Sequence, residues 1–121
     1  MEYQDIAFAP DGAYIEKNCP MIDAMKVIGG KWKLTLIGRI YRQSLARFGE
    51  LRRSLVGITQ KMLTAQLREL ERDGIIHRKV YAEIPPKVEY TLTEYGLTLE
   101  PIVSLLYAWG EEHRRKQVGL L

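Results

Sequence analysis

The chain has 121 residues, 46% of them hydrophobic and 27% charged, with a net charge of +3, which is typical of one ordinary globular domain. No apolar run approaches the roughly 20 residues that cross a bilayer, and the N-terminus lacks the basic cluster of a secretory signal, so we expect neither a membrane-spanning nor a secreted protein. The single cysteine, Cys19, excludes an intrachain disulfide and favours a reducing cytoplasm.

The N-terminal third begins with an arm, residues 1–18, that has no clear hydrophobic period. Asn18, Cys19 and Pro20 then predict a helix start, with a capping side chain beside a proline at the first helical position. Gly29 and Gly30 should break this helix. A second helix follows, with a buried stripe formed by Trp32, Leu36, Ile37 and Ile40.

The middle of the chain predicts a pair of helices joined by a turn. A short helix should cover 48–55, and Gly57 marks the turn. In the stretch ITQKMLTAQLRELERDGII, residues 58–76, Thr59 is the expected N-cap and Gly74 the expected stop. The inward face carries Leu63, Leu67 and Leu70. The outward face carries Lys61, Ala65, Arg68 and Arg72, with Thr64 beside them and Gln60 at the edge of the buried stripe.

After Gly74 the period changes from 3.6 to 2, which predicts two strands around the loop AEIPPK. This loop should protrude as a flap that carries Lys87. Thr93 should cap a final helix that Pro101 either kinks or begins. One side of that helix is apolar beyond the needs of a monomer, and its members are Leu99, Ile102, Val103, Leu106 and Trp109.

This order of elements predicts a mainly α fold with a small β hairpin (α+β), a winged helix-turn-helix. The helix after Thr59 would enter the DNA major groove. Lys61 and Arg68 can reach phosphate or guanine, while Thr64 and Ala65 are short enough for close approach. From 31 to 61 the chain has eight Lys or Arg against one acid, Glu50, which favours a polyanion partner. The alternative for the helix alone is an ordinary solvated surface.

Four blocks of the chain together resemble the HxlR-type transcriptional regulators, relatives of the MarR group: NCPMIDAMKVIGGKWKLTLIGRI, RFGELRRSLVGITQKMLTAQLRELERDGIIHRKVY, IPPKVEYTLTEYG and LEPIVSLLYAWG. The resemblance covers about Asn18 to Gly110. It implies a homodimer on a pseudo-palindromic double-stranded operator, with the wing near Pro85 and Pro86 and a dimer built by the terminal helices. Gly49 departs from the family, whose members commonly carry a polar residue there.

We therefore expect a single winged-helix domain over 1–121, divided into an N-terminal arm (1–18), a winged-helix core (19–92) and a C-terminal dimerisation helix (93–121). The expected DNA contacts are Thr59, Gln60, Lys61, Thr64, Ala65, Arg68, Arg47, Arg52 and Lys87. The expected dimer interface is Leu99, Ile102, Val103, Leu106 and Trp109.

Cys19 is a candidate sensor of oxidants or electrophiles, because a helix start lowers the pKa of a thiol and some members of the resembled family sense through a cysteine at this place. The competing interpretation is an unreactive, half-buried residue. His77 and His113 lack ligands at metal spacing, and no catalytic or cofactor motif is present, so we expect no metal site, no cofactor and no enzyme. The alternative function is a winged-helix protein-interaction module without DNA binding.

Overall fold

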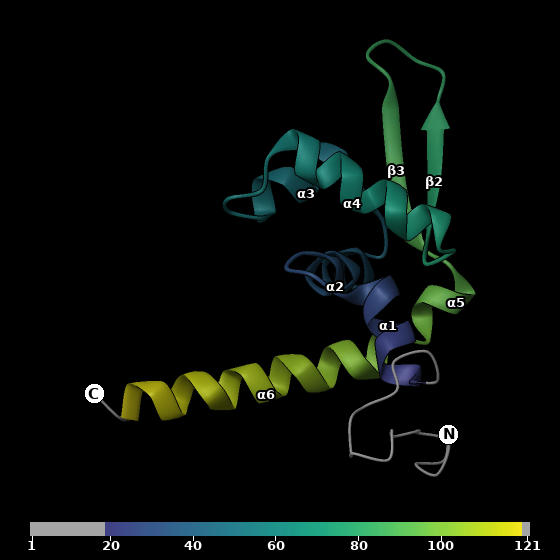
Figure 1. The fold of residues 1–121 in the computed structure, drawn as a ribbon. Helices are drawn as coiled ribbons and strands as arrows, with labels where there is room; N and C mark the ends of the chain where they lie inside the picture. Colours follow the sequence, from purple (N-terminus) through teal and green to yellow (C-terminus); the bar gives the residue numbers. More distant parts are fainter. Residues whose placement is uncertain (1–18, 120–121) are drawn as a thin grey trace.

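The computed structural model describes residues 19–119, and it has the winged helix-turn-helix architecture (Figure 1). The mainly α prediction is confirmed. None of the helices in this part of the chain is both long and apolar enough to cross a membrane. In chain order the elements are α1 (Pro20–Ile28), α2 (Lys33–Gln43), β1 (Ala46–Arg47), α3 (Phe48–Ser54), α4 (Gln60–Arg72), β2 (Ile76–Tyr81), β3 (Lys87–Leu92), α5 (Glu94–Leu97) and α6 (Glu100–Gly119).

The first two helices are separated where the glycine pair predicts a break. Pro20 is at the start of α1, as expected, but the N-cap is Cys19 and its side chain makes no capping hydrogen bond. Cys19 therefore does not supply the expected capping side chain, and Asn18, the other candidate for it, lies outside the described residues. Gly30 has a φ of +95°, a left-handed conformation that favours glycine and that turns the chain between α1 and α2.

The core forms where α2, α3 and α4 pack together. The stripe predicted on α2 is confirmed, since Leu36, Ile37 and Ile40 have no exposed surface, while Trp32 packs partly buried against them. Burial of each such side chain stabilises the fold by about 1.5–3 kcal/mol. The buried residues of the neighbouring helices are Leu51 and Leu55 around α3 and Leu63, Leu67 and Leu70 on α4.

The sheet has three antiparallel strands in the order β1-β3-β2, not the two of the predicted hairpin. The additional strand β1 pairs Ala46 with Tyr90 and Arg47 with Glu89. A strand of two residues has no measurable period, which is why the sequence does not reveal it. The β2–β3 hairpin runs out beyond the core, as Figure 1 shows. Val80 is therefore 51% exposed, although its alternation with polar residues is typical of an inward-facing position.

The C-terminal segment is two helices rather than the single helix expected over 93–121. Thr93 caps α5, its hydroxyl oxygen accepting from the backbone N–H of Gly96 at 2.9 Å. The same hydroxyl donates to the carbonyl of Gly74 at 2.6 Å, which ties α5 to the end of α4. Pro101 lies in the first turn of α6, so it begins the long helix instead of kinking it.

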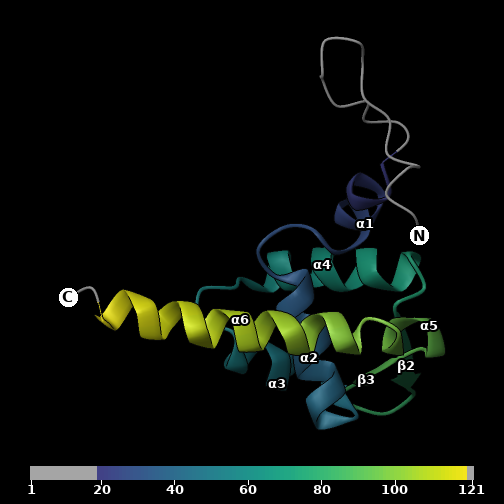
Figure 2. The same ribbon diagram turned by 90° about the horizontal axis from the view of Figure 1, so that it is seen from below.

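Helix α6 crosses α2 and extends past the rest of the body (Figure 2). Gly38 of α2 permits this close crossing, because a Cβ there would lie 3.1 Å from the side chains of Val103 and Tyr107. Val103 is buried at this contact, and Leu99 is half-buried. The large apolar side chains of α6 that remain exposed are Ile102, Leu105, Leu106, Tyr107, Trp109 and Val118.

Candidate nucleic-acid interface

The local sequence determines where α4 begins and ends. Thr59 is the N-cap, and its hydroxyl oxygen accepts from the backbone N–H of Met62 at 3.1 Å. Such a cap stabilises a helix by about 1 kcal/mol. Ile58 and Leu63, the expected hydrophobic staple, are both buried. Gly74 closes the helix with a φ of +76°, as predicted.

The outward face of α4 is free on the side opposite its leucines. Lys61, Ala65, Arg68 and Arg72 are all exposed. Thr64 is half-buried, and its hydroxyl donates to the carbonyl of Gln60 at 2.8 Å. Gln60 is itself exposed rather than at the edge of the buried stripe. Helix α4 and the wing lie on the side of the molecule away from α6 (Figure 1), so a long polyanion can approach them without meeting the C-terminal helix.

A second group of basic side chains flanks the start of α4. Arg52 and Arg53 are exposed on the last turn of α3 and line a shallow depression together with Gln60. Arg47, the N-cap of α3, is exposed as well. Gly49 is exposed in the first turn of α3, where a Cβ would lie 3.3 Å from the Arg53 guanidinium. The arginines therefore extend the basic surface of α4 along α3.

A polar cavity of about 190 Å³ separates the other flank of α4 from the sheet. Arg68 and Thr64 reach it from α4, and Arg78 and Tyr90 reach it from the strands. Burial raises the pKa of the Tyr90 hydroxyl. Arg78 is absent from the predicted contacts, although the alternation of β2 places it between Ile76 and Val80 on the face that turns toward α4. The signal in the sequence that could have identified Arg78 is a basic residue on a strand face that is otherwise apolar.

The wing corrects the expectation for Lys87. This residue begins β3 instead of lying in the flap, and its Nζ is 3.5 Å from Oε1 of Glu89. The ammonium also lies 4.6 Å from the ring centre of Tyr81, over whose ring Lys79 lies at 4.8 Å. A hydrogen bond from Tyr81, followed by the charge of Lys87, holds the pKa of the buried Glu89 below its usual range. Lys87 is thus paired within the wing.

Cys19 lies apart from this surface, at the start of α1. Its backbone carbonyl accepts from the N–H of Asp23 at 3.2 Å, the first hydrogen bond of the helix. The residue is 4% exposed, so the thiol is shielded in this conformation.

Comparison with known proteins agrees with this architecture. The model of the HxlR-like helix-turn-helix family matches residues 27–118. The chain is 54% identical to the uncharacterized HTH-type transcriptional regulator YybR of Bacillus subtilis (strain 168) over 99 residues, 82% of this chain and 78% of that protein.

Solved structures give the same result. The redox regulator HypR in its reduced form is 52% identical, with a TM-score of 0.77 over 84% of this chain and 99% of that one. Its oxidised form is 56% identical, with a TM-score of 0.74 over 78% and 96%. The match over most of the chain, together with the capped helix α4 and the wing, shows that this chain belongs to the HxlR-like helix-turn-helix family of transcriptional regulators.

Proposed function

We propose that the chain is a sequence-specific DNA-binding transcriptional regulator that acts as a homodimer on an operator with two half-sites. The observation that carries this proposal is the outward face of α4, where basic and small side chains are exposed opposite a buried leucine stripe. A winged helix-turn-helix uses this helix to read the major groove.

Each part of the surface has a separate task in this proposal. Lys61 and Arg68 contact phosphate or guanine, and Thr64 and Ala65 allow the helix to approach the base edges. Thr59 and Gln60 contribute at the first turn, where free backbone N–H groups attract phosphate. Arg47 and Arg52 contact the phosphates beside the groove, as does Lys87 if its pairing with Glu89 is exchanged for a phosphate.

The dimer in this proposal is built by α6. A side chain as large as Trp109 is 68% exposed, Leu106 is 47% exposed and Ile102 is 44% exposed, which is more apolar surface than an isolated helix face needs. Val103, on the inner side of α6, and Leu99, directly before this helix, pack against the core and would support the interface from within. Two-fold symmetry then places the paired α4 helices about 34 Å apart, one turn of the duplex.

We expect the protein to shift a specific genomic fragment in a band-shift titration, with two chains per operator by analytical ultracentrifugation. Because phosphate neutralisation dominates affinity, binding should weaken by about 10³-fold between 50 and 200 mM salt. A fragment of the same length and scrambled sequence serves as the control. The alternative function, a protein-interaction module, requires no specific band at any salt concentration, and that outcome would reject DNA binding.

We also propose that Cys19 adjusts DNA affinity in response to oxidants or electrophiles. The support is the similarity to HypR, which is described as a redox regulator in oxidised and reduced forms, together with the position of Cys19 at a helix start. With one cysteine per chain, the products are a thioether with an electrophile, a mixed disulfide with a small thiol, or a bridge between subunits. The bridge requires the two Cα atoms to lie within about 7 Å.

Treatment with a maleimide or with diamide plus glutathione should change the operator affinity of the wild-type protein and leave that of Cys19→Ser unchanged. Intact-mass spectrometry on the same samples reports the adduct. A Cys19 that stays unmodified, or an adduct that leaves affinity unaltered, would remove the sensor role while leaving DNA binding intact.

A further inference from the structure

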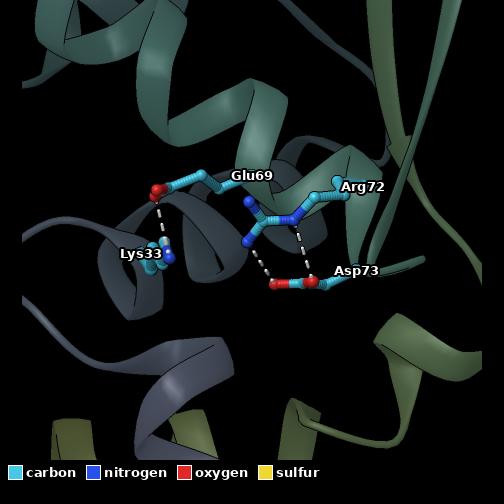
Figure 3. Close-up of polar contacts among 4 residues, drawn as sticks. All are labelled: Lys33, Glu69, Arg72 and Asp73. Atoms are coloured by element: carbon cyan, nitrogen blue, oxygen red, sulfur yellow. Dashed lines mark hydrogen bonds and ion pairs between the residues drawn. The ribbon is translucent and has the colours of Figure 1, made fainter.

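One ion pair joins the second helix to the DNA-facing helix. The Nζ of Lys33, the first residue of α2, lies 3.0 Å from Oε2 of Glu69 on α4 (Figure 3). The Lys33 side chain is 8% exposed, while that of Glu69 is 41% exposed. The pair therefore has one buried partner and one at the surface, at the seam between the two helices.

A lysine at position 33 would destabilise the folded state if Glu69 did not pair with it. The first turn of a helix carries a partial positive charge, which disfavours a cation there, and the first turn of α2 has no acidic residue. A buried ammonium also loses its hydration and needs an opposite charge. Glu69 supplies that charge from another helix. The local stability of α2 therefore does not explain why a lysine stands at position 33.

The other ion pairs of residues 19–119 are local. Arg72 pairs with the adjacent Asp73 at the end of α4, as Figure 3 also shows. The remaining two pairs join Lys87 to Glu89 within β3 and Arg115 to Glu112 within α6. Among the described residues, the Lys33–Glu69 pair is the only ion pair that joins two different elements. It is therefore the ion pair that can constrain how α4 lies against α2.

The geometry of α4 indicates what this constraint does. Its three buried leucines hold one side by apolar contacts, which are not directional. At about 100° per residue, Glu69 lies on one flank of that stripe, whereas Thr64 and Glu71 lie on the other flank, beside the sheet cavity. A directional contact at Glu69 therefore limits rotation of α4 about its own axis, and this rotation decides whether Lys61 and Arg68 point into the groove.

We propose that Lys33 and Glu69 are positioning residues for DNA recognition: their ion pair sets the rotation of α4 without touching the nucleic acid. This inference rests on the proposed function, because it concerns how the same surface is presented. Glu69→Gln should keep the fold and weaken operator binding by about 3- to 30-fold. The direction is informative, since removal of a negative charge by itself would strengthen binding to DNA.

The matched control is Glu94→Gln, which removes the same charge from an exposed position on α5, outside the proposed DNA surface and the α6 interface, and should leave affinity unchanged or slightly higher. The exchange variant Lys33→Glu/Glu69→Lys keeps the net charge and should return affinity toward the wild-type value. The salt dependence of binding should be the same in Glu69→Gln and wild type, because no phosphate contact is lost. If the pair had only a structural role, Glu69→Gln would lower the melting temperature but would not weaken operator binding at temperatures where the variant is folded.

Amide hydrogen exchange tests the pair independently of DNA. Glu69→Gln should accelerate exchange in α4 relative to α6, and unchanged exchange in α4 would overturn the proposal. Accelerated exchange with wild-type affinity for the operator would overturn it as well. If the wild-type protein binds no DNA, the proposed function fails, and the exchange measurement alone then decides whether the pair holds α4.

Discussion

Lys61→Glu should lower operator affinity by about 100-fold or more, because each subunit of the proposed dimer exchanges an attractive contact for a repulsive one. Lys61 is exposed at the second position of α4. A glutamate at the start of a helix is favoured by the helix dipole, by about 0.3–1 kcal/mol. The variant should therefore melt at the wild-type temperature or slightly above it while losing DNA binding. Band-shift titration and circular dichroism of the same preparation measure both effects.

Lys116→Glu is the control for long-range charge. It makes the same reversal at an exposed position near the end of α6, on the side of the molecule away from α4 (Figure 1). Its operator affinity should stay within a few-fold of wild type at concentrations where sedimentation shows the wild-type oligomeric state, because surface charges beyond about 10 Å are largely screened at 0.1 M salt. Equal losses in the two variants would contradict a specific role for the α4 face and indicate a general electrostatic effect.

Gly96→Ala should destabilise the fold by about 3 kcal/mol, at the upper end of overpacking costs. Gly96 is buried in α5, and a Cβ there would overlap the backbone carbonyl of Ile75. This carbonyl cannot easily move away, since it accepts from the backbone N–H of Thr93 at 3.0 Å. Urea denaturation monitored by circular dichroism should show a lower midpoint with a similar slope.

Gly110→Ala is the matched substitution with the opposite expected sign. Gly110 lies inside α6, and a Cβ there would meet no atom within 4 Å. Alanine should therefore stabilise the helix by about 0.5–1 kcal/mol, since glycine loses more conformational freedom on folding. If both variants shifted the urea midpoint alike, the steric explanation for Gly96 would be wrong.

Much of the fold could be predicted because its signals are local. Thr59 and Gly74 delimit α4 through hydrogen bonding and backbone conformation within a few residues of the chain. The spacing of Leu63, Leu67 and Leu70 then decides which side of the helix is buried. Exposure of Lys61 on the opposite side follows from the same periodicity.

Other features depend on residues that are distant in sequence. Strand β1 exists because Ala46 and Arg47 meet β3, more than 40 positions later, and two residues carry no pattern of their own. Lys87 looks like a free base in the sequence, yet the hairpin register brings Tyr81 opposite it, and Glu89 lies on the same strand face.

The sequence by itself determined the ends of α4, its buried stripe and the basic character of its outer face, because a helix is specified by contacts along one short segment. Only the tertiary structure decided that Arg78 lines a cavity beside Arg68 and that Lys33 pairs with Glu69. These contacts join elements whose relative placement depends on how the whole core packs, and no local period records that placement.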